Sequence, residues 1–357
     1  MKPIYRSAID NPVDYDNLGL MFLQEKYLSI LSKVRQRVVE NNWFEESVLS
    51  KGDYSGFDWN VAARQLIHGF AISDLLNVSP EKLIDLWCNY CMMRIVPIYL
   101  MDDSLDSLQY RSKNEAIICN TKASLHAIAA LARGVPELES LPGGTAFLRI
   151  YLQCLENMAK TIYKEVSTRY PEDLLLFSQR CIDNIDGYES SLRRRSTLDL
   201  FARGISAMMC RSLASNEWAI KYDMAGQLLD DISDVWEDLY FGRLTYPISL
   251  CIVIERENKE LMDIIKQVWQ ESGTLGFQQL KIQYWPQISK HLIDLSVFDN
   301  AFQKALTLID DTRHGLESES QHENREALLV LVDLKEAFCR RLMQTQCNDK
   351  QPAFNFY

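Results

Sequence analysis

Apolar residues recur every three to four positions along almost the whole chain, and this spacing constrains the fold more than any other feature. One example is the series Leu23, Tyr27, Ile30, Leu31, Val34 and Val38, which places its side chains on one face of a helix. Glycine and proline, which interrupt helices, number only 14 and 10 among 357 residues, about 7% against an average of about 12%. We therefore predict an all-α chain and exclude an all-β sandwich, a collagen-like chain and a disordered chain.

Further helical patterns cover residues 61–72, 79–108, 113–133, 145–167, 171–193, 197–214, 216–239, 245–256, 258–271, 294–313 and 320–346. Pro97 lies inside the second of these, where it should kink the helix or free a backbone carbonyl. No repeat, low-complexity stretch or linker divides the chain. We therefore predict a single helical-bundle domain of about ten to twelve helices over residues 21–346, with an irregular arm at residues 1–20 and a loose tail at residues 347–357.

The charge of the chain bears on its partners. Aspartate and glutamate number 49 against 38 lysines and arginines, which gives a net charge of −11. Such a surface repels phosphate backbones, so we expect no nucleic-acid partner. An acidic protein can still bind an anionic substrate when metal cations mediate the contact. The first residues lack the features of a signal peptide and no apolar run is long enough to span a bilayer, so we expect a cytoplasmic protein with no integral membrane segment.

Two acidic stretches carry the candidate chemistry. The first contains Asp102, Asp103 and Asp106, and the four-residue spacing of its outer members places them on one helix face. The second contains Asp230, Asp231, Asp234 and Asp238, of which the first, third and fourth form a stripe over about two helical turns. A single stretch of this kind is more often a solvated acidic face. Two copies in strongly apolar helices favour a site where carboxylates hold magnesium against a diphosphate.

The two stretches, DDSLD at 102–106 and DDISD at 230–234, resemble the paired aspartate-rich motifs of class I isoprenoid synthases. That superfamily contains the trans-isoprenyl diphosphate synthases and the class I terpene cyclases, and the resemblance covers roughly residues 20–345. It implies a helical bundle around a central active-site cavity and three magnesium ions. It also implies seven metal ligands, namely Asp102, Asp103, Asp106, Asp230, Asp231, Asp234 and Asp238.

The resemblance extends to residues that flank the second motif. Gln227 matches the glutamine of the FQxxDDxxD sequence in isoprenyl diphosphate synthases, with Gly226 in place of the phenylalanine. The segment 242–247, Gly-Arg-Leu-Thr-Tyr-Pro, is similar to a loop in which a lysine binds the allylic diphosphate, and Arg243 would take that role. The resemblance further implies a prenyl pocket lined by Ile98, Tyr99, Phe201 and Gln227.

Three further arginines complete the expected diphosphate site. Arg111 matches the first arginine after the first motif, which contacts the allylic diphosphate in the resembling synthases. Arg194 and Arg195 lie where terpene cyclases carry a diphosphate-sensing arginine, and the sequence does not choose between them. A basic helix end is the alternative interpretation of that pair. We expect Arg194, Arg195 and Arg243 to be the catalytic cations.

Two departures from the elongating synthases shape the functional prediction. Ser112 replaces the second arginine after the first motif, which helps to bind isopentenyl diphosphate. The stretch 52–66 lacks the Gly-Lys-x-x-Arg-Pro sequence that binds the same substrate. We therefore predict a class I terpene synthase, a lyase that uses magnesium to ionise an acyclic allylic prenyl diphosphate, cyclises the carbocation to a terpene and releases diphosphate.

Two alternatives stay open. One is a trans-prenyl diphosphate synthase that elongates the chain with isopentenyl diphosphate. The other is a non-catalytic subunit of a synthase, although such a subunit has no need to keep two complete acidic motifs. Substrates of ten, fifteen and twenty carbons are all consistent with the motifs. Dimerisation is common in the resembling family, so a homodimer is one expected state.

Overall fold

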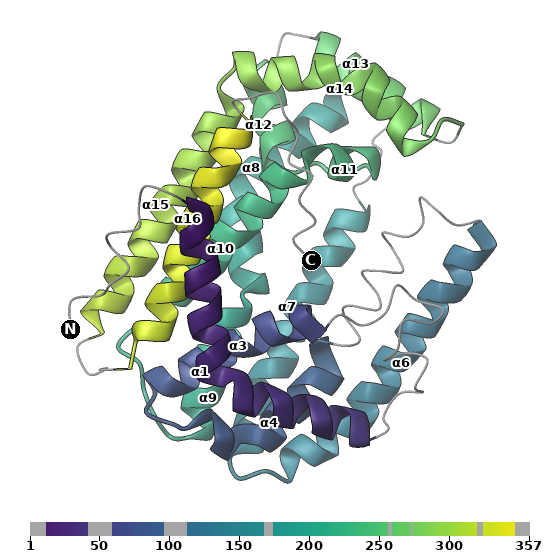
Figure 1. Ribbon diagram of the computed structural model, residues 1–357. Coiled ribbons are helices and arrows are strands. Elements are labelled where there is room, and N and C mark those ends of the chain that lie inside the picture. Colours follow the sequence, from purple (N-terminus) through teal and green to yellow (C-terminus); the bar gives the residue numbers. More distant parts are fainter. Residues whose placement is uncertain are drawn as a thin grey trace.

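The computed structural model describes residues 12–41, 59–95, 113–167, 174–255, 259–272, 274–319 and 324–346, and these residues form helices without a strand. Figure 1 labels them as α1 (Pro12–Glu40), α3 (Trp59–Leu75), α4 (Ile84–Tyr90), α6 (Lys113–Glu139), α7 (Gly144–Ser167), α8 (Leu174–Arg195), α9 (Thr197–Met208), α10 (Glu217–Ser233), α11 (Val235–Tyr240), α12 (Tyr246–Ile254), α13 (Lys259–Glu271), α14 (Phe277–Asp294), α15 (Val297–Ser318) and α16 (Glu326–Gln346). The all-α prediction is confirmed. No helix among the described residues combines the length and apolar character needed to cross a membrane.

Helix α1 illustrates how apolar spacing produces the bundle. Leu23, Tyr27, Ile30, Val34 and Val38 are each at most 3% exposed, so the predicted apolar face is the buried face. The helix packs against α16 at the other end of the described chain and against α3 and α4. It begins at Pro12, so the expectation of an irregular arm through residue 20 is wrong for residues 12–20. Proline suits the first helical position because its missing N–H has no helical partner there.

Helix α10 lies in the middle of the bundle. It packs against α15, α9, α8 and α12, and Figure 1 shows it running between the α15–α16 pair and α8. The aromatic part of the core lies toward α3, α4 and α9, where the ring of Phe201 is 5.9 Å from that of Trp87 and 4.7 Å from that of Tyr90. Each of these three residues is at most 2% exposed. This packing holds α9 against α4, and α9 also packs against α10; both α9 and α10 carry residues that line the candidate site.

The segment predicted as one helix over residues 79–108 is interrupted. Its described part comprises a 3₁₀ turn (η2, Pro80–Leu83), α4, and a π-helical turn (η3, Cys91–Ile95), and residues 96–112 lie outside the described part. Pro97 has no N–H to donate to the carbonyl of Met93. The hydroxyl of Tyr151 donates to that carbonyl at 3.4 Å. The 3₁₀ and π-helical turns contradict a regular helix over the described residues, whereas Pro97 lies outside them, so the kink or freed carbonyl expected there stays a prediction.

Two more helical boundaries differ from the sequence prediction. Helix α14 lies where no helix was predicted, between residues 271 and 294; it contains Pro286, and Leu280, Tyr284, Ile288 and Leu292 bury one face at a four-residue spacing. The predicted helix over residues 216–239 is divided at Asp234 into α10 and α11. The hydrogen bonds from the amide of Asp234 to Asp230 and from the amide of Asp238 to Asp234 persist across the break, at 3.0 and 2.9 Å. The acidic stripe therefore bends at its middle residue.

The α7–α9 contact leads to a stability prediction for Gly204. A Cβ atom at this position would lie 2.7 Å from the ring of Phe147, which is fully buried. We expect Gly204→Ala to lower the free energy of unfolding by about 1–3 kcal/mol, because overpacking outweighs the better helix propensity of alanine. Gly187 in α8 is the matched control, since a Cβ atom there would meet no other atom within 4 Å. Urea titration should show Gly187→Ala as stable as the parent or more so, and equal effects of both changes would contradict this account.

Candidate functional site

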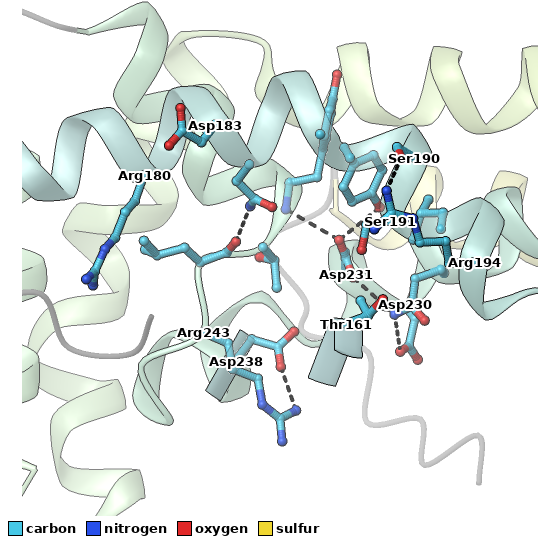
Figure 2. A pocket seen from close by; sticks show the side chains of 18 of the residues that line it. Thr161, Arg180, Asp183, Ser190, Ser191, Arg194, Asp230, Asp231, Asp238 and Arg243 are labelled. Atoms are coloured by element: carbon cyan, nitrogen blue, oxygen red, sulfur yellow. Dashed lines mark hydrogen bonds and ion pairs between the residues drawn. The ribbon is translucent and has the colours of Figure 1, made fainter. Parts of the chain in front are cut away.

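A cavity of about 360 Å³ opens between α8, α10, α11 and the segment that leads into α12, with α7 on one side (Figure 2). Its lining includes several residues predicted from the sequence, namely Arg194, Gln227, Asp230, Asp231, Asp238 and Arg243. These residues come from three helices and one loop, and Figure 2 shows Arg180 and Arg194 on opposite sides of Asp231. The structure thus gathers three of the four aspartates of the second acidic stretch and two of the predicted cations around one space.

Helix α8 contributes a face of polar residues that the sequence interpretation missed. Arg180, Asn184, Tyr188 and Ser191 line the cavity and are spaced three or four positions apart, as residues on one helix face are, and Asp183 beside Asn184 lines it too. This regular spacing of polar residues along α8 is the sequence signal that could have predicted their place in the cavity. Lys160 and Thr161 of α7 were also missed. Asn184 donates hydrogen bonds to the carbonyl of Leu244 and, at 2.9 Å, to the hydroxyl of Ser249, so it holds the segment that precedes α12.

Asp230 and Asp231 are neighbours in sequence but occupy different environments. Asp230 is exposed and lines the cavity, and Gln227 donates to its carboxylate at 3.1 Å. Asp231 is 7% exposed and accepts hydrogen bonds from the hydroxyl of Tyr188 at 2.9 Å and from the amide of Tyr246 at 3.4 Å. Asp231 therefore joins α10 to α8 and α12, whereas Asp230 presents its charge to the cavity.

Asp238 lies at the far end of the acidic stripe and forms an ion pair with Arg243 at 3.1 Å. Burial, together with the nearby charges of Asp231 and Asp230, raises the pKa of its carboxyl group well above the usual range, and the guanidinium of Arg243 opposes this shift. Asp234 is partly buried at the helix break, accepts from the hydroxyl of Ser233 at 3.1 Å, and is not among the residues that line the cavity.

The turn after α11 explains why Arg243 reaches back to Asp238. Gly242 has a φ of 74°, its amide donates to the carbonyl of Leu239 at 3.0 Å, and the amide of Arg243 donates to the carbonyl of Asp238 at 2.8 Å. This is the Schellman arrangement that ends many helices, and it favours glycine because side chains are strained at positive φ. The turn reverses the chain directly after the helix and places the Arg243 guanidinium beside the Asp238 carboxylate.

The basic run at the end of α8 divides into residues with different surroundings. Arg194 lines the cavity and donates to the hydroxyl of Ser190 at 3.1 Å. Arg193 instead forms an ion pair with Glu217 at the start of α10, where its second nitrogen donates at 2.8 Å. The side chain of Arg195 lies outside the described part. Of the two arginines between which the sequence did not choose, Arg194 is thus the one whose described side chain faces the cavity.

Other predicted residues do not lie around this cavity. Phe201 is fully buried in the aromatic core and lines neither described cavity, so its prenyl-pocket role stays a prediction. The remaining predicted residues fall in the stretch 96–112, outside the described part of the chain, so the structure does not describe how the first motif faces the second. These residues are Ile98, Tyr99, Asp102, Asp103, Asp106 and Arg111.

A second cavity of about 290 Å³ adjoins the first, because Leu192, Gln227 and Asp230 line both. Its remaining lining residues are Ser196, Thr197, Asp223, Gly226 and Lys335. Lys335 belongs to α16 near the C-terminal end of the described chain and was not anticipated from the sequence. No spacing within one helix could have indicated it, since only the packing of α16 beside α10 brings it to the site.

The residues present fit a divalent metal held jointly with a substrate. The described residues contain no group of three side chains that could hold a metal ion by themselves. Magnesium characteristically takes one or two carboxylates and completes its octahedron with substrate phosphates and water. Asp230 supplies one exposed carboxylate at the junction of the two cavities. Cationic side chains on the same wall could neutralise the remaining phosphate charge.

We predict that the Asp238–Arg243 pair contributes to stability as well as to the site. The side chains of Asp238 and Arg243 are 12% and 26% exposed. Arg243→Met should lower the free energy of unfolding by about 2 kcal/mol, less than for a fully buried pair, because it leaves the Asp238 carboxylate without its cation. The double variant with Asp238→Asn should regain part of the loss in a urea titration. Strictly additive losses would show that the two side chains do not interact energetically.

Comparison with known proteins places the chain structurally. No protein-family profile and no curated protein sequence matches it. Among solved structures it is similar to a decaprenyl diphosphate synthase from Rhodobacter capsulatus, with a TM-score of 0.65 and 15% identity over 93% of this chain and 99% of that one. It is also similar to a polyprenyl synthase from Caulobacter crescentus CB15, crystallised with calcium and isoprenyl diphosphate, with a TM-score of 0.62 and 15% identity over 89% and 97% of the two chains.

A third similar structure is the heptaprenyl diphosphate synthase from Staphylococcus aureus, with a TM-score of 0.55 and 14% identity over 90% of this chain and 98% of that one. The three likenesses extend over most of both chains, so they concern the whole helical arrangement and not a shared fragment. At these identities they establish the fold and not the reaction. The helical architecture is therefore the class I isoprenoid synthase fold, in the form found in trans-prenyl diphosphate synthases.

Proposed function

We propose that this chain is an enzyme that binds an allylic prenyl diphosphate with divalent metal ions and ionises it. The observation that carries the proposal is the convergence of Asp230 with Arg194 and Arg243 on one cavity. An anionic group with several oxygens can be held there by cations on two sides. The Caulobacter structure is a complex with calcium and isoprenyl diphosphate, and a divalent metal with a diphosphate is the ligand chemistry that this cavity would accept.

The residues of the cavity suggest how the chemistry proceeds. Arg194 and Arg243 would donate charge-assisted hydrogen bonds to diphosphate oxygens, and these bonds strengthen as the leaving group gains negative charge. Bound magnesium supplies Lewis-acid stabilisation of the same oxygens. The allylic C–O bond breaks, its electron pair departs with the diphosphate, and an allylic carbocation is left. Gln227 would keep the Asp230 carboxylate oriented through its 3.1 Å hydrogen bond.

The comparisons favour condensation with isopentenyl diphosphate as the fate of this carbocation. Two of the similar structures are named as prenyl diphosphate synthases and the third as a polyprenyl synthase, and none of these three is named as a cyclase. In that reaction the double bond of the second substrate attacks the cation, a carbon–carbon bond forms, and a proton leaves. Our main expectation of a terpene cyclase is thus less well supported than the chain-elongation alternative, and we propose trans-prenyl transfer as the first candidate.

One observation keeps cyclisation as the second candidate. The stretch 52–66, where elongating synthases would carry Gly-Lys-x-x-Arg-Pro, contains no lysine. Its described part forms the first turns of α3, in which Ala62 is fully buried and Arg64 is exposed. With Ser112 in place of an arginine, the sequence offers few cations for a second diphosphate. An enzyme without that second site would direct the cation to the double bonds of its own chain.

A product assay separates these fates. Purified protein with magnesium should be incubated with geranyl, farnesyl and geranylgeranyl diphosphate in turn, with and without isopentenyl diphosphate. Longer prenyl diphosphates that form only with isopentenyl diphosphate would establish elongation. Hydrocarbons or alcohols that form from one allylic substrate alone, detected by gas chromatography and mass spectrometry, would establish cyclisation. Absence of diphosphate release under every condition would contradict the proposed function and favour a non-catalytic subunit.

A further inference from the structure

Lys335 extends from α16 to the face of α10 that carries the site. Its Nζ atom donates to the backbone carbonyl of Tyr222 at 2.7 Å and lies 3.3 Å from the centre of the Tyr222 ring. A Cβ atom on Gly226 would lie 2.6 Å from the same nitrogen. The ammonium group therefore occupies space that any other residue at position 226 would fill. Gly226 and Asp230 are four residues apart in α10, so they share a helix face.

The hydrogen-bonding capacity of this ammonium group is only partly used. A lysine side chain has three N–H donors, and among the described residues the Tyr222 carbonyl is the acceptor found for Nζ. No described carboxylate lies within 4.0 Å of it. Burial lowers the pKa of Lys335 to about 8, and the charge of Asp223 opposes the shift. A cation kept in such a place needs compensation by an anion or by water.

Asp223 is the nearest candidate for that anion, but its carboxylate is used elsewhere. It accepts a hydrogen bond from the hydroxyl of Ser196 at 2.8 Å and another from the amide of Leu198 at 2.7 Å. Both donors belong to the start of α9, where a carboxylate is stabilised by the helix dipole and by unpaired amides. Asp223 therefore caps α9, and Lys335 lines the same cavity as Asp223, Thr197 and Asp230.

A second cation lies behind the same wall. Arg94 is 3% exposed, and its Nη2 atom donates to the hydroxyl of Thr197 at 3.2 Å. Its Nη1 atom is buried without a hydrogen-bond partner, and no carboxylate forms an ion pair with it among the described residues. Lys335 lines the cavity that joins the main cavity at Asp230, and Arg94 lies behind its wall, bonded to the lining residue Thr197. This arrangement suits an anion with several oxygens.

We propose that Lys335 is a binding residue for the diphosphate group of the prenyl substrate. The absence of a side chain at Gly226 leaves the room that the Lys335 ammonium group occupies. This inference rests on the proposed function and adds to it a cation from the C-terminal helix. The diphosphate would extend from the Arg194–Arg243 cavity past Asp230 to the Lys335 cavity. The competing interpretation is that Lys335 only braces α16 against the Tyr222 ring.

The test measures binding of inorganic pyrophosphate in the presence of magnesium by isothermal titration calorimetry, so that no turnover is involved. Lys335→Met keeps the length of the side chain and its packing on Tyr222 but removes the charge. We expect its Kd to be about tenfold weaker than that of the parent. Lys335→Arg should keep most of the affinity. Lys290 on α14 is exposed, and Lys290→Met, the control for the loss of one positive charge, should bind as the parent does.

Each outcome has a defined meaning. An unchanged Kd for Lys335→Met would overturn the inference and leave the proposed function intact. A parent protein that binds no pyrophosphate with magnesium would overturn both. Equal losses in Lys335→Met and Lys335→Arg, accompanied by lower thermal stability of the free proteins, would show that the residue is only a brace. Lys335→Gln replaces the methionine variant if that one does not fold, and the same affinity loss is expected of it.

Discussion

Replacing Asp230 with alanine should lower kcat/KM for the allylic diphosphate at least about 100-fold, the loss typical of removing a group that stabilises developing charge. Asp230 is exposed and lines both cavities, so its carboxylate is placed to hold a metal ion against the diphosphate. The fold should be affected less than by a change at Asp231, because Asp230 is exposed whereas Asp231 is buried and accepts from the Tyr188 hydroxyl. The measurement is the rate of diphosphate release at saturating magnesium.

The control for Asp230 is Asp263, an exposed aspartate on α13. Asp263→Ala should retain the parent rate, since it removes one negative charge from another part of the surface. Circular dichroism and thermal unfolding should be the same for the parent and both variants. A rate for Asp230→Ala within threefold of the parent would remove this residue from the set of metal ligands and leave the second motif without its exposed carboxylate in the cavity.

Replacing the neighbouring Asp231 with alanine should cost stability, by about 3 kcal/mol in a urea titration. The change removes the acceptor of two donors, the Tyr188 hydroxyl and the Tyr246 amide, in buried residues that are 5% and 9% exposed, and of the partly buried Gln227 amide. Leaving buried donors without an acceptor costs about 1–3 kcal/mol each. The loss would loosen the junction of α8, α10 and α12, which shapes one wall of the cavity.

Two further variants of this junction test whether the lost hydrogen bonds cause the expected loss of stability. Asp231→Asn keeps an acceptor oxygen at the same place, so it should lose much less stability than alanine. In the Tyr188→Phe background one of the donors is already absent, and Asp231→Ala should then cost less than in the parent. Equal costs in both backgrounds would show that the hydrogen bond at 2.9 Å is not the source of the stability.

The helical architecture could be read from apolar spacing because each buried face repeats within one helix, as Leu23 to Val38 illustrate in α1. Boundaries were harder to predict where a local signal conflicted with packing. Pro286 argues against a helix, but the buried series Leu280, Tyr284, Ile288 and Leu292 outweighs the hydrogen bond that the proline forfeits. The helix breaks at Asp234, where the sequence has neither proline nor glycine, so no residue type there predicted the division into α10 and α11.

The candidate site was predictable where its residues are close in sequence and not where only the fold joins them. The carboxylates of α10 and the turn at Gly242 form one continuous segment, which a motif can reveal. A motif could not reveal that Asp231 serves Tyr188 of α8 while Asp230 faces the cavity, because that division depends on how three helices pack. Arg94 and Lys335 were missed for the same reason, since their partners Thr197 and Tyr222 lie in helices remote in sequence.

The contact between Gly226 and Lys335 also leads to an expectation about how these two positions evolve. Position 226 is a glycine here, where the resembling synthases carry phenylalanine, and the Lys335 ammonium lies where any side chain would begin. Residues in direct contact tend to change together during evolution. Among descendants of a common ancestor, we therefore expect a long cation at position 335 to accompany glycine at position 226, and a large residue at 226 to exclude it. The two positions would then be gained or lost as one character, which could divide this group of proteins into lineages.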